Sequence, residues 1–84
     1  MKQVTVRYFA SIREALDCDV ERVATDAPTV AALRDELIAR GGAHAHALAR
    51  GRAVRAAIDQ VMSDESAPLA DSAEVAFFPP VTGG

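Results

Sequence analysis

The sequence predicts an α+β fold, with a mixed sheet of about five strands packed on one main helix. Three observations support this class. Apolar and polar residues alternate near both ends of the chain, a central stretch has the apolar spacing of a helix, and polar or glycine-containing segments separate these stretches. With 84 residues there is room for one hydrophobic core, so we predict a single domain over residues 1–84.

The first elements are predicted to form a hairpin with an elaborated loop. Apolar and polar residues alternate over residues 4–9, which is typical of a half-buried strand. Ser11 and Glu14 have the spacing of a capping box, so we expect a short helical turn there. A second, weaker strand follows over residues 20–24.

The main helix is predicted over residues 30–40. Thr29 stands at the N-cap position, and the apolar residues that follow form one stripe. Glu36 and Arg40 have the i, i+4 spacing of an ion pair, and the glycines at 41–42 supply a stop signal.

The second half of the chain is predicted to complete the sheet. An irregular helical stretch over residues 43–50 precedes another alternating segment that ends at Ile58. A turn at 59–60 leads to a brief strand over residues 61–62, and the last strand spans 74–78. We expect the first and last strands to be parallel neighbours in the centre of the sheet.

Composition argues against several classes of function. The net charge is −3, and the basic knot of Arg50, Arg52 and Arg55 is interpreted as a solvated turn, so we expect no nucleic acid partner. No apolar run approaches the roughly 20 residues that span a bilayer, so we expect no membrane partner. A strand begins almost at once and the single cysteine cannot form an internal disulfide, so we expect no signal peptide and a cytoplasmic location.

We expect no bound metal or cofactor. His44 and His46 are two residues apart, so they point in nearly opposite directions on a helix, and both are expected to be exposed. Cys18 has no neighbouring base or second cysteine and is interpreted as an ordinary loop thiol. The acidic residues within 17–21 and 64–65 are interpreted as hydrated surface charges.

The alternation also predicts an apolar patch on the outer face of the sheet. If the inward residues of the first and last strands pack on the helix, Phe9 and Phe78 face away from it on neighbouring strands. Met62 can join them from the adjoining short strand. We interpret this patch as a docking surface. Loops that cover Phe9, or a Phe78 side chain that curls into the core edge, are the alternatives.

The end of the chain suggests that its terminal carboxyl group is the working chemical group. The final residues are Phe-Phe-Pro-Pro-Val-Thr-Gly-Gly, in which the prolines favour an extended chain and the glycines leave the last carbonyl carbon unshielded. We therefore predict a projecting tail over residues 79–84, whose residues 81–84 could reach about 13 Å into another protein. A frayed terminus with an incidental diglycine is the alternative.

The chain resembles the small subunits of molybdopterin synthase, a branch of the ubiquitin-like, β-grasp sulfur carriers. The resemblance covers essentially the whole chain and is strongest over residues 74–84. It also includes Tyr8-Phe9-Ala10, Arg13-Glu14, Pro28-Thr29-Val30 and Leu33. Two departures affect turns: residues 71–74 read Asp-Ser-Ala-Glu where such proteins usually have Asp-Gly-Asp-Glu, and Asp59 stands where asparagine is common.

This resemblance implies a function at Gly84. An adenylating partner enzyme would use ATP and Mg²⁺ to convert the Gly84 carboxylate to an acyl-adenylate, and a sulfur donor would then displace AMP to give a thiocarboxylate. The tail, with Pro80, Val81, Thr82 and Gly83, would insert into the synthase large subunit and donate sulfur to the cyclic pyranopterin precursor of the molybdenum cofactor.

The resemblance also implies a division of labour between subunits. Catalytic residues are expected on the large subunit, so the chain is not an enzyme on its own. Phe9, Met62 and Phe78 would contact that subunit, and two small and two large subunits would form a heterotetramer. Three alternatives remain open: a sulfur carrier for thiamine thiazole synthesis, a ubiquitin-like protein modifier conjugated through Gly84, and a plain interaction module.

Overall fold

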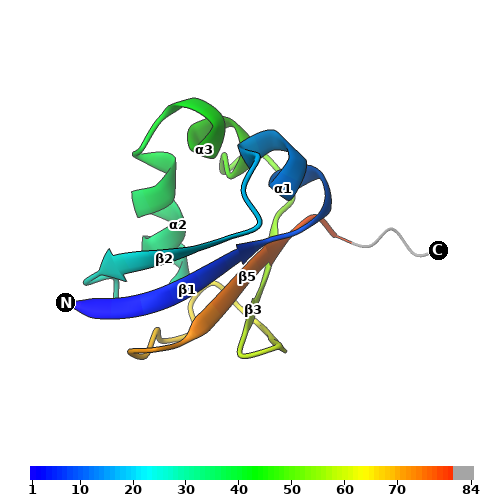
Figure 1. Ribbon diagram of the computed structural model, residues 1–84. Helices are drawn as coiled ribbons and strands as arrows, with labels where there is room; N and C mark the ends of the chain where they lie inside the picture. Colours follow the sequence, from blue (N-terminus) through cyan, green and yellow to red (C-terminus); the bar gives the residue numbers. More distant parts are fainter. Residues whose placement is uncertain (81–84) are drawn as a thin grey trace.

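The computed structural model describes residues 1–80, and its framework is a five-stranded sheet with the order β2-β1-β5-β3-β4 (Figure 1). The strands are β1 (Lys2–Tyr8), β2 (Val20–Thr25), β3 (Arg55–Ile58), β4 (Val61–Ser63) and β5 (Glu74–Phe78). The central strands β1 and β5 are parallel, and the other neighbouring pairs are antiparallel. The predicted mixed sheet and its central parallel pair are confirmed.

The helices lie on one side of this sheet (Figure 1). The longest is α2 (Val30–Ile38), and it is accompanied by the shorter α1 (Ala10–Leu16) and α3 (Gly42–Ala47). Within residues 1–80, no helix is both long and apolar enough to cross a membrane.

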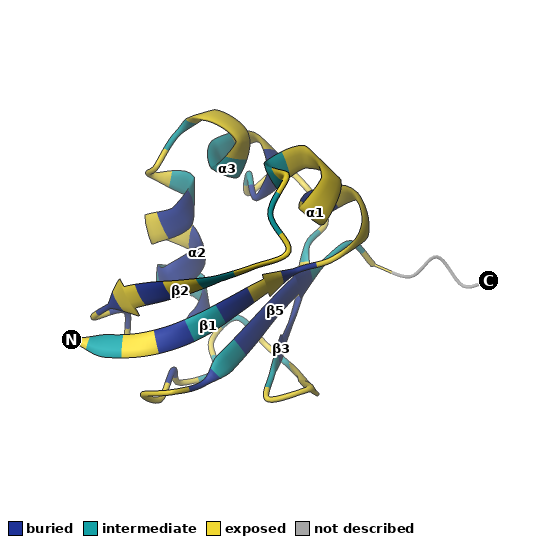
Figure 2. Ribbon diagram, viewed as in Figure 1, coloured by how far each residue is buried: buried dark blue, intermediate teal, exposed yellow. Residues whose placement is uncertain are grey.

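The hydrophobic core fills the space between the helices and the inner face of the sheet (Figure 2). Alternate residues of β1 and β5 point into it, because successive side chains of a strand point to opposite faces. The largest fully buried side chains are Tyr8, Phe77, Leu33, Leu37, Leu48, Val4, Val6, Val30 and Val75. Residues between these on β1 and β5 therefore face the side of the sheet that the helices leave uncovered.

The start of α2 is confirmed, and its end is corrected. The Thr29 hydroxyl accepts a hydrogen bond from the Ala32 N–H at 3.2 Å, as an N-cap does. The helix ends at Ile38, so the predicted pair of Glu36 with Arg40 does not form. Instead, Glu36 accepts a hydrogen bond from Thr25, because that hydroxyl lies on the adjacent strand β2.

The predicted capping box of α1 is wrong. The helix begins at Ala10, so Ser11 lies inside it, and the N-cap residue Phe9 makes no side-chain cap. The Phe9 carbonyl already accepts hydrogen bonds from the Ile12 and Arg13 N–H groups. The first helical turn therefore starts before Ser11, and Ser11 does not stand at the N-cap position from which its side chain could cap the helix.

The turn at 59–60 between β3 and β4 is confirmed. Asp59 and Gln60 both have left-handed φ values, 49° and 71°, which suit the right-handed twist of a tight hairpin. Asp59 Oδ1 also accepts a hydrogen bond from the Glu74 N–H at 3.0 Å. The aspartate at position 59 therefore fits this turn and also ties it to β5.

The basic knot is more than a solvated turn. Arg50 donates hydrogen bonds to the carboxylates of Asp35 and Glu65 and to the Ala31 carbonyl. Beside it, the buried Arg34 donates to the Leu48 carbonyl at 2.8 Å and also pairs with Glu65. These contacts connect α2 to the segments that contain Leu48, Arg50 and Glu65. Glu65 is therefore a structural partner and not merely a hydrated charge.

Candidate functional site

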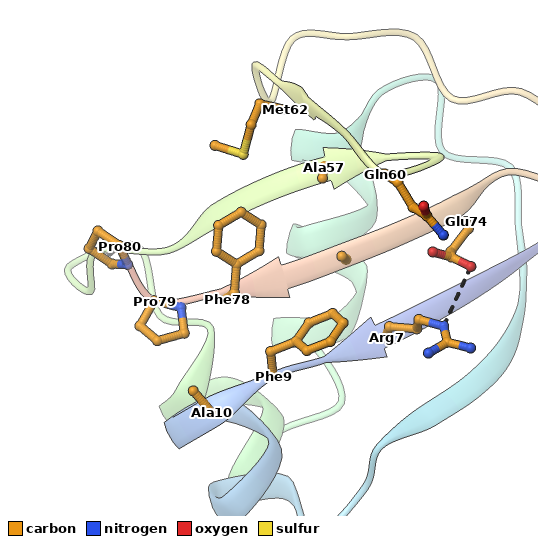
Figure 3. A pocket seen from close by; sticks show the side chains of 11 residues that line it. Arg7, Phe9, Ala10, Ala57, Gln60, Met62, Glu74, Phe78, Pro79 and Pro80 are labelled. Carbon is orange, nitrogen blue, oxygen red and sulfur yellow. Dashed lines mark ion pairs between the residues drawn. The ribbon is translucent and has the colours of Figure 1, made fainter. Parts of the chain in front are cut away.

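The uncovered face of the sheet carries a hollow of about 820 Å³, which we call the sheet hollow (Figure 3). It lies over β1, β5, β3 and β4, next to the point where β5 ends and the tail begins. Its lining residues are Arg7, Phe9, Ala10, Ala57, Gln60, Met62, Glu74, Ala76, Phe78, Pro79 and Pro80. The hollow therefore joins the sheet surface to the first residues of the predicted tail.

Three apolar side chains form the part of the hollow nearest the tail. Phe9 is 40% exposed, Met62 is 55% exposed, and Phe78 is half-buried. Figure 3 shows Phe9 and Phe78 side by side at the ends of neighbouring strands, with Met62 beyond Phe78. The alternation thus placed Phe9 and Phe78 on the uncovered face, where Met62 joins them from β4. Neither covering loops nor a fully buried Phe78 replaces that arrangement. Their role in binding a partner remains a prediction.

The opposite part of the hollow is polar. The Arg7 Nε atom lies 3.4 Å from the Glu74 Oε1 atom, so the two charges on β1 and β5 pair with each other. Gln60 from the turn after β3 lies beside Glu74 (Figure 3). Because the pair compensates its own charge, the hollow presents an apolar half and a nearly neutral polar half.

Buried residues at the ends of β1 and β5 hold Phe9 and Phe78 in place on the outer face. Tyr8 and Phe77 are fully buried, and their rings stack with centroids 6.5 Å apart. The Phe9 N–H donates a hydrogen bond to the Phe77 carbonyl at 3.1 Å. Since Phe9 and Phe78 directly follow these anchored residues, the core fixes where the outer side chains stand.

A polar cluster secures the Tyr8 hydroxyl at the edge of the core. The Tyr8 hydroxyl donates a hydrogen bond to Glu21 Oε2 at 2.7 Å, and the Arg40 guanidinium donates one to Glu21 Oε1 at 2.8 Å. A ring nitrogen of His44 lies 3.2 Å from Glu21 Oε2, and the His44 ring meets the Tyr8 ring edge-on. The cluster links β1, β2 and the segment from α2 to α3.

This cluster shifts the pKa values of two of its members. Burial alone raises the pKa of Glu21, but hydrogen bonds from Arg40, Tyr8 and His44 outweigh it and lower the pKa to about 2. Burial, together with the hydrogen bond to Glu21, raises the pKa of Tyr8. Glu21 is therefore ionised, and Tyr8 keeps its proton as the donor.

Two expectations about polar residues are corrected by this cluster. His44 is half-buried and not solvent-exposed, because α3 places it against Tyr8 and Glu21. Glu21 is a shared acceptor and not a simple hydrated charge. His46 is exposed, as expected.

No group of three or more histidine, cysteine, aspartate or glutamate side chains within residues 1–80 is placed to hold a metal ion. Cys18 lies between α1 and β2, and its Sγ donates weakly to the Val20 carbonyl at 3.6 Å. Val81, Thr82, Gly83 and Gly84, the remaining predicted site residues, lie outside the described residues.

Among the lining residues that were not predicted from the sequence are Ala57 and Ala76. The alternation of β5 places Ala76 on the same face as Phe78, so that signal was available. The position of Ala57 beside it depends on the register between β3 and β5, which are far apart in the sequence. Small apolar residues also carry no chemical signal of their own.

Comparison with known proteins gives a consistent result. A family model described as the ThiS family matches residues 6–84. The chain is also 46% identical to a protein of Escherichia coli (strain K12) named "Molybdopterin synthase sulfur carrier subunit", in a match that covers 96% of this chain and 99% of that protein.

Solved structures resemble the chain over nearly its whole length. Small archaeal modifier protein 1 of H. volcanii superposes with a TM-score of 0.78 at 23% identity, covering 96% of this chain and all of that one. A chain from the complex of subunits 1 and 2 of the molybdopterin-converting factor of Helicobacter pylori gives a TM-score of 0.67 at 25% identity, covering 98% and 99%. The predicted ubiquitin-like β-grasp fold is confirmed.

Proposed function

The chain belongs to the ThiS family and, within it, to the molybdopterin synthase sulfur carrier subunits, and we propose on this basis that it carries sulfur for molybdenum cofactor biosynthesis. The observation that carries the proposal is the 46% identity to the Escherichia coli carrier over 99% of that protein. The sheet hollow supports this proposal, because a carrier needs a surface to which its partner proteins bind, and exposed apolar patches mark such surfaces.

We place the reactive group at the carboxylate of Gly84. A free carboxylate is a poor electrophile, so an activating enzyme must first transfer AMP from ATP to it with the help of Mg²⁺, releasing pyrophosphate. A sulfur donor then displaces AMP and leaves a thiocarboxylate, whose ionised sulfur is a soft nucleophile. The carrier supplies no acid or base for these steps, because its partners provide them.

We further propose that the loaded carrier docks on the synthase large subunit. Phe9, Met62 and Phe78 form the apolar contact, while the tail from Pro80 to Gly84 enters the active site of the large subunit. Sulfur passes there to the cyclic pyranopterin precursor, and two small and two large subunits make up the assembly. Because ATP is consumed in loading, we expect the carrier to work in the cytoplasm.

Intact-mass spectrometry tests the loading step directly. The chain is incubated with its activating enzyme, ATP, Mg²⁺ and a sulfur source, and the mass of its C-terminal peptide is then measured. We expect replacement of one oxygen by sulfur in that peptide, and no change when ATP is omitted. An unaltered C-terminal peptide under the complete conditions would contradict the proposal.

A binding comparison separates this function from its alternatives. We expect the chain to bind a molybdopterin synthase large subunit and not a thiazole synthase; the reverse preference would identify a carrier for thiamine synthesis. Isopeptide-linked ladders between Gly84 and lysines of other proteins in cells would instead identify a protein modifier.

A further inference from the structure

One row of side chains crosses four strands on the uncovered face of the sheet. The register pairs Arg7 of β1 with Ala76 of β5, Ala76 with Ala57 of β3, and Ala57 with Met62 of β4. Cross-strand partners share a face, so these four side chains stand in line. The outer two are long and the central two are alanines, so the row dips in its middle.

Taller side chains flank this dip along the strands. Two residues beyond Ala76 on β5 stands Phe78, with Phe9 next to it just past the end of β1, and two residues before Ala76 stands Glu74. Ala57 and Ala76 are only 7% and 9% exposed, although they face the side that the helices leave uncovered. The taller neighbouring side chains therefore limit the access of solvent to the two alanines. This part of the sheet hollow is a pit whose floor is formed by Ala57 and Ala76.

The walls of the pit determine what it can accept. Phe9, Phe78 and Met62 offer apolar surface, and the charges of Arg7 and Glu74 compensate each other across 3.4 Å. An occupant therefore needs no charge of its own, and a charged one would lose its hydration without gaining a free partner. The chemistry of the pit fits one bulky apolar side chain.

The position of the pit indicates which partner supplies that side chain. Pro79 and Pro80, the first residues of the tail, line the same hollow as the two alanines. A protein that receives the tail must therefore lie over or beside the pit. We propose that Ala57 and Ala76 form the floor of a socket for one bulky apolar side chain of the synthase large subunit. This inference rests on the proposed function.

In this socket, the small size of the Ala57 and Ala76 side chains determines which partner can bind. Each floor methyl leaves space above it, and a larger residue at either position would occupy the volume that the partner needs. Interface energy concentrates where an anchor side chain enters a well-packed pocket, so filling this pocket removes a main anchor and not a peripheral contact.

Two filling variants and one matched control test the socket. Ala76→Leu and Ala57→Leu place extra bulk on the floor, whereas Ala24→Leu adds the same bulk at an exposed position of β2, paired with Gln3 and outside the lining of the hollow. Affinity for the large subunit from the same organism is measured by titration calorimetry. We expect at least tenfold weaker binding for each filling variant and wild-type affinity for Ala24→Leu.

A measurement on the unmodified chain avoids any dependence on the folding of variants. Alanine methyl groups are labelled with carbon-13, and intermolecular nuclear Overhauser effects are recorded in the complex with the large subunit. The methyls of Ala57 and Ala76 should contact side-chain protons of an apolar residue of the partner, and that of Ala24 should not.

The outcomes separate the socket from the proposed function. Binding of the unmodified chain with no contacts to the two floor methyls, or with full affinity in both folded filling variants, would overturn the socket and leave the function standing. Failure of the unmodified chain to bind the large subunit at all would overturn both.

Discussion

At the scale of single residues, Phe78 links the sheet to the tail. It lies between Phe9, Met62 and Pro79 in the sheet hollow (Figure 3). Phe78→Asp would bury a carboxylate in a surface that loses water on docking, so we expect the affinity for the large subunit to fall by roughly 2–4 kcal/mol. Titration calorimetry measures the loss.

The control for this change is Val61→Asp. Val61 is 66% exposed on β4, next to Met62, but it does not line the hollow. We expect it to bind the large subunit nearly as well as the unmodified chain. Equal affinities for the Phe78→Asp variant and the unmodified chain would remove Phe78 from the interface.

Glu21 makes stability depend on pH in the acid range. Its pKa in the folded chain is about 2, below the ordinary 4.5, so ionised Glu21 favours the folded state. This contribution is complete above about pH 5 and is lost as the pH falls from about 4.5 to about 2. We expect Glu21→Gln to reduce the free energy of unfolding at pH 7 and to flatten its fall in acid.

Urea unfolding at a series of pH values measures this effect. Asp19→Asn is the matched control, because Asp19 is an exposed carboxylate just before the same strand. Glu21→Gln should change the acid-side slope more than this control does. A Glu21→Gln variant with the full wild-type slope would show that the cluster around Tyr8 does not hold the carboxylate in its ionised form.

At the scale of elements, the N-cap of α2 contributes to the stability of the helix on which the sheet packs. Thr29 accepts a hydrogen bond from the Ala32 N–H, and its removal would leave a helix-end donor without this partner. We expect Thr29→Ala to lower the free energy of unfolding by about 1 kcal/mol. Thr29→Ser keeps the hydroxyl and should retain most of the stability; similar losses for both variants would contradict the capping role.

Elements whose signals are local could be predicted from the sequence, and their ends often could not. The alternation of β1 and β5 and the cap at Thr29 depend on neighbouring residues, and the structure confirms them. The partner of Arg40 just after α2 depends on a distant residue, because Arg40 pairs with Glu21 of β2 and not with Glu36. A pattern limited to one segment contains no information about that competition.

At the scale of the whole molecule, the same distinction separates the two halves of the site. Phe9 and Phe78 could be assigned to the outer face from alternation alone, since the inner residues of both strands are plainly apolar. The alanine floor required the register of β3 against β5, and the Tyr8–Glu21–His44 contacts required the packing of α3. Both arise when segments far apart in the sequence meet.

The fold separates the stable body from the proposed reactive group. Among the described residues 1–80, the last residue of the hydrophobic core is Phe77, which stands seven positions before Gly84. Deleting Gly84 should therefore leave the free energy of unfolding unchanged. It should also abolish sulfur loading, because the new terminal carboxylate stops roughly 3.3–3.6 Å short of the activating centre.

Thermal unfolding and intact-mass spectrometry together test this separation. A full-length form with an amidated C-terminus is the matched control: it keeps every side chain and the full reach but has no free carboxylate, so it should also fail to load. If the shortened chain loads as fast as the unmodified one, the reactive group lies elsewhere. If it unfolds at a clearly lower temperature, the end of the chain belongs to the fold and not to the chemistry alone.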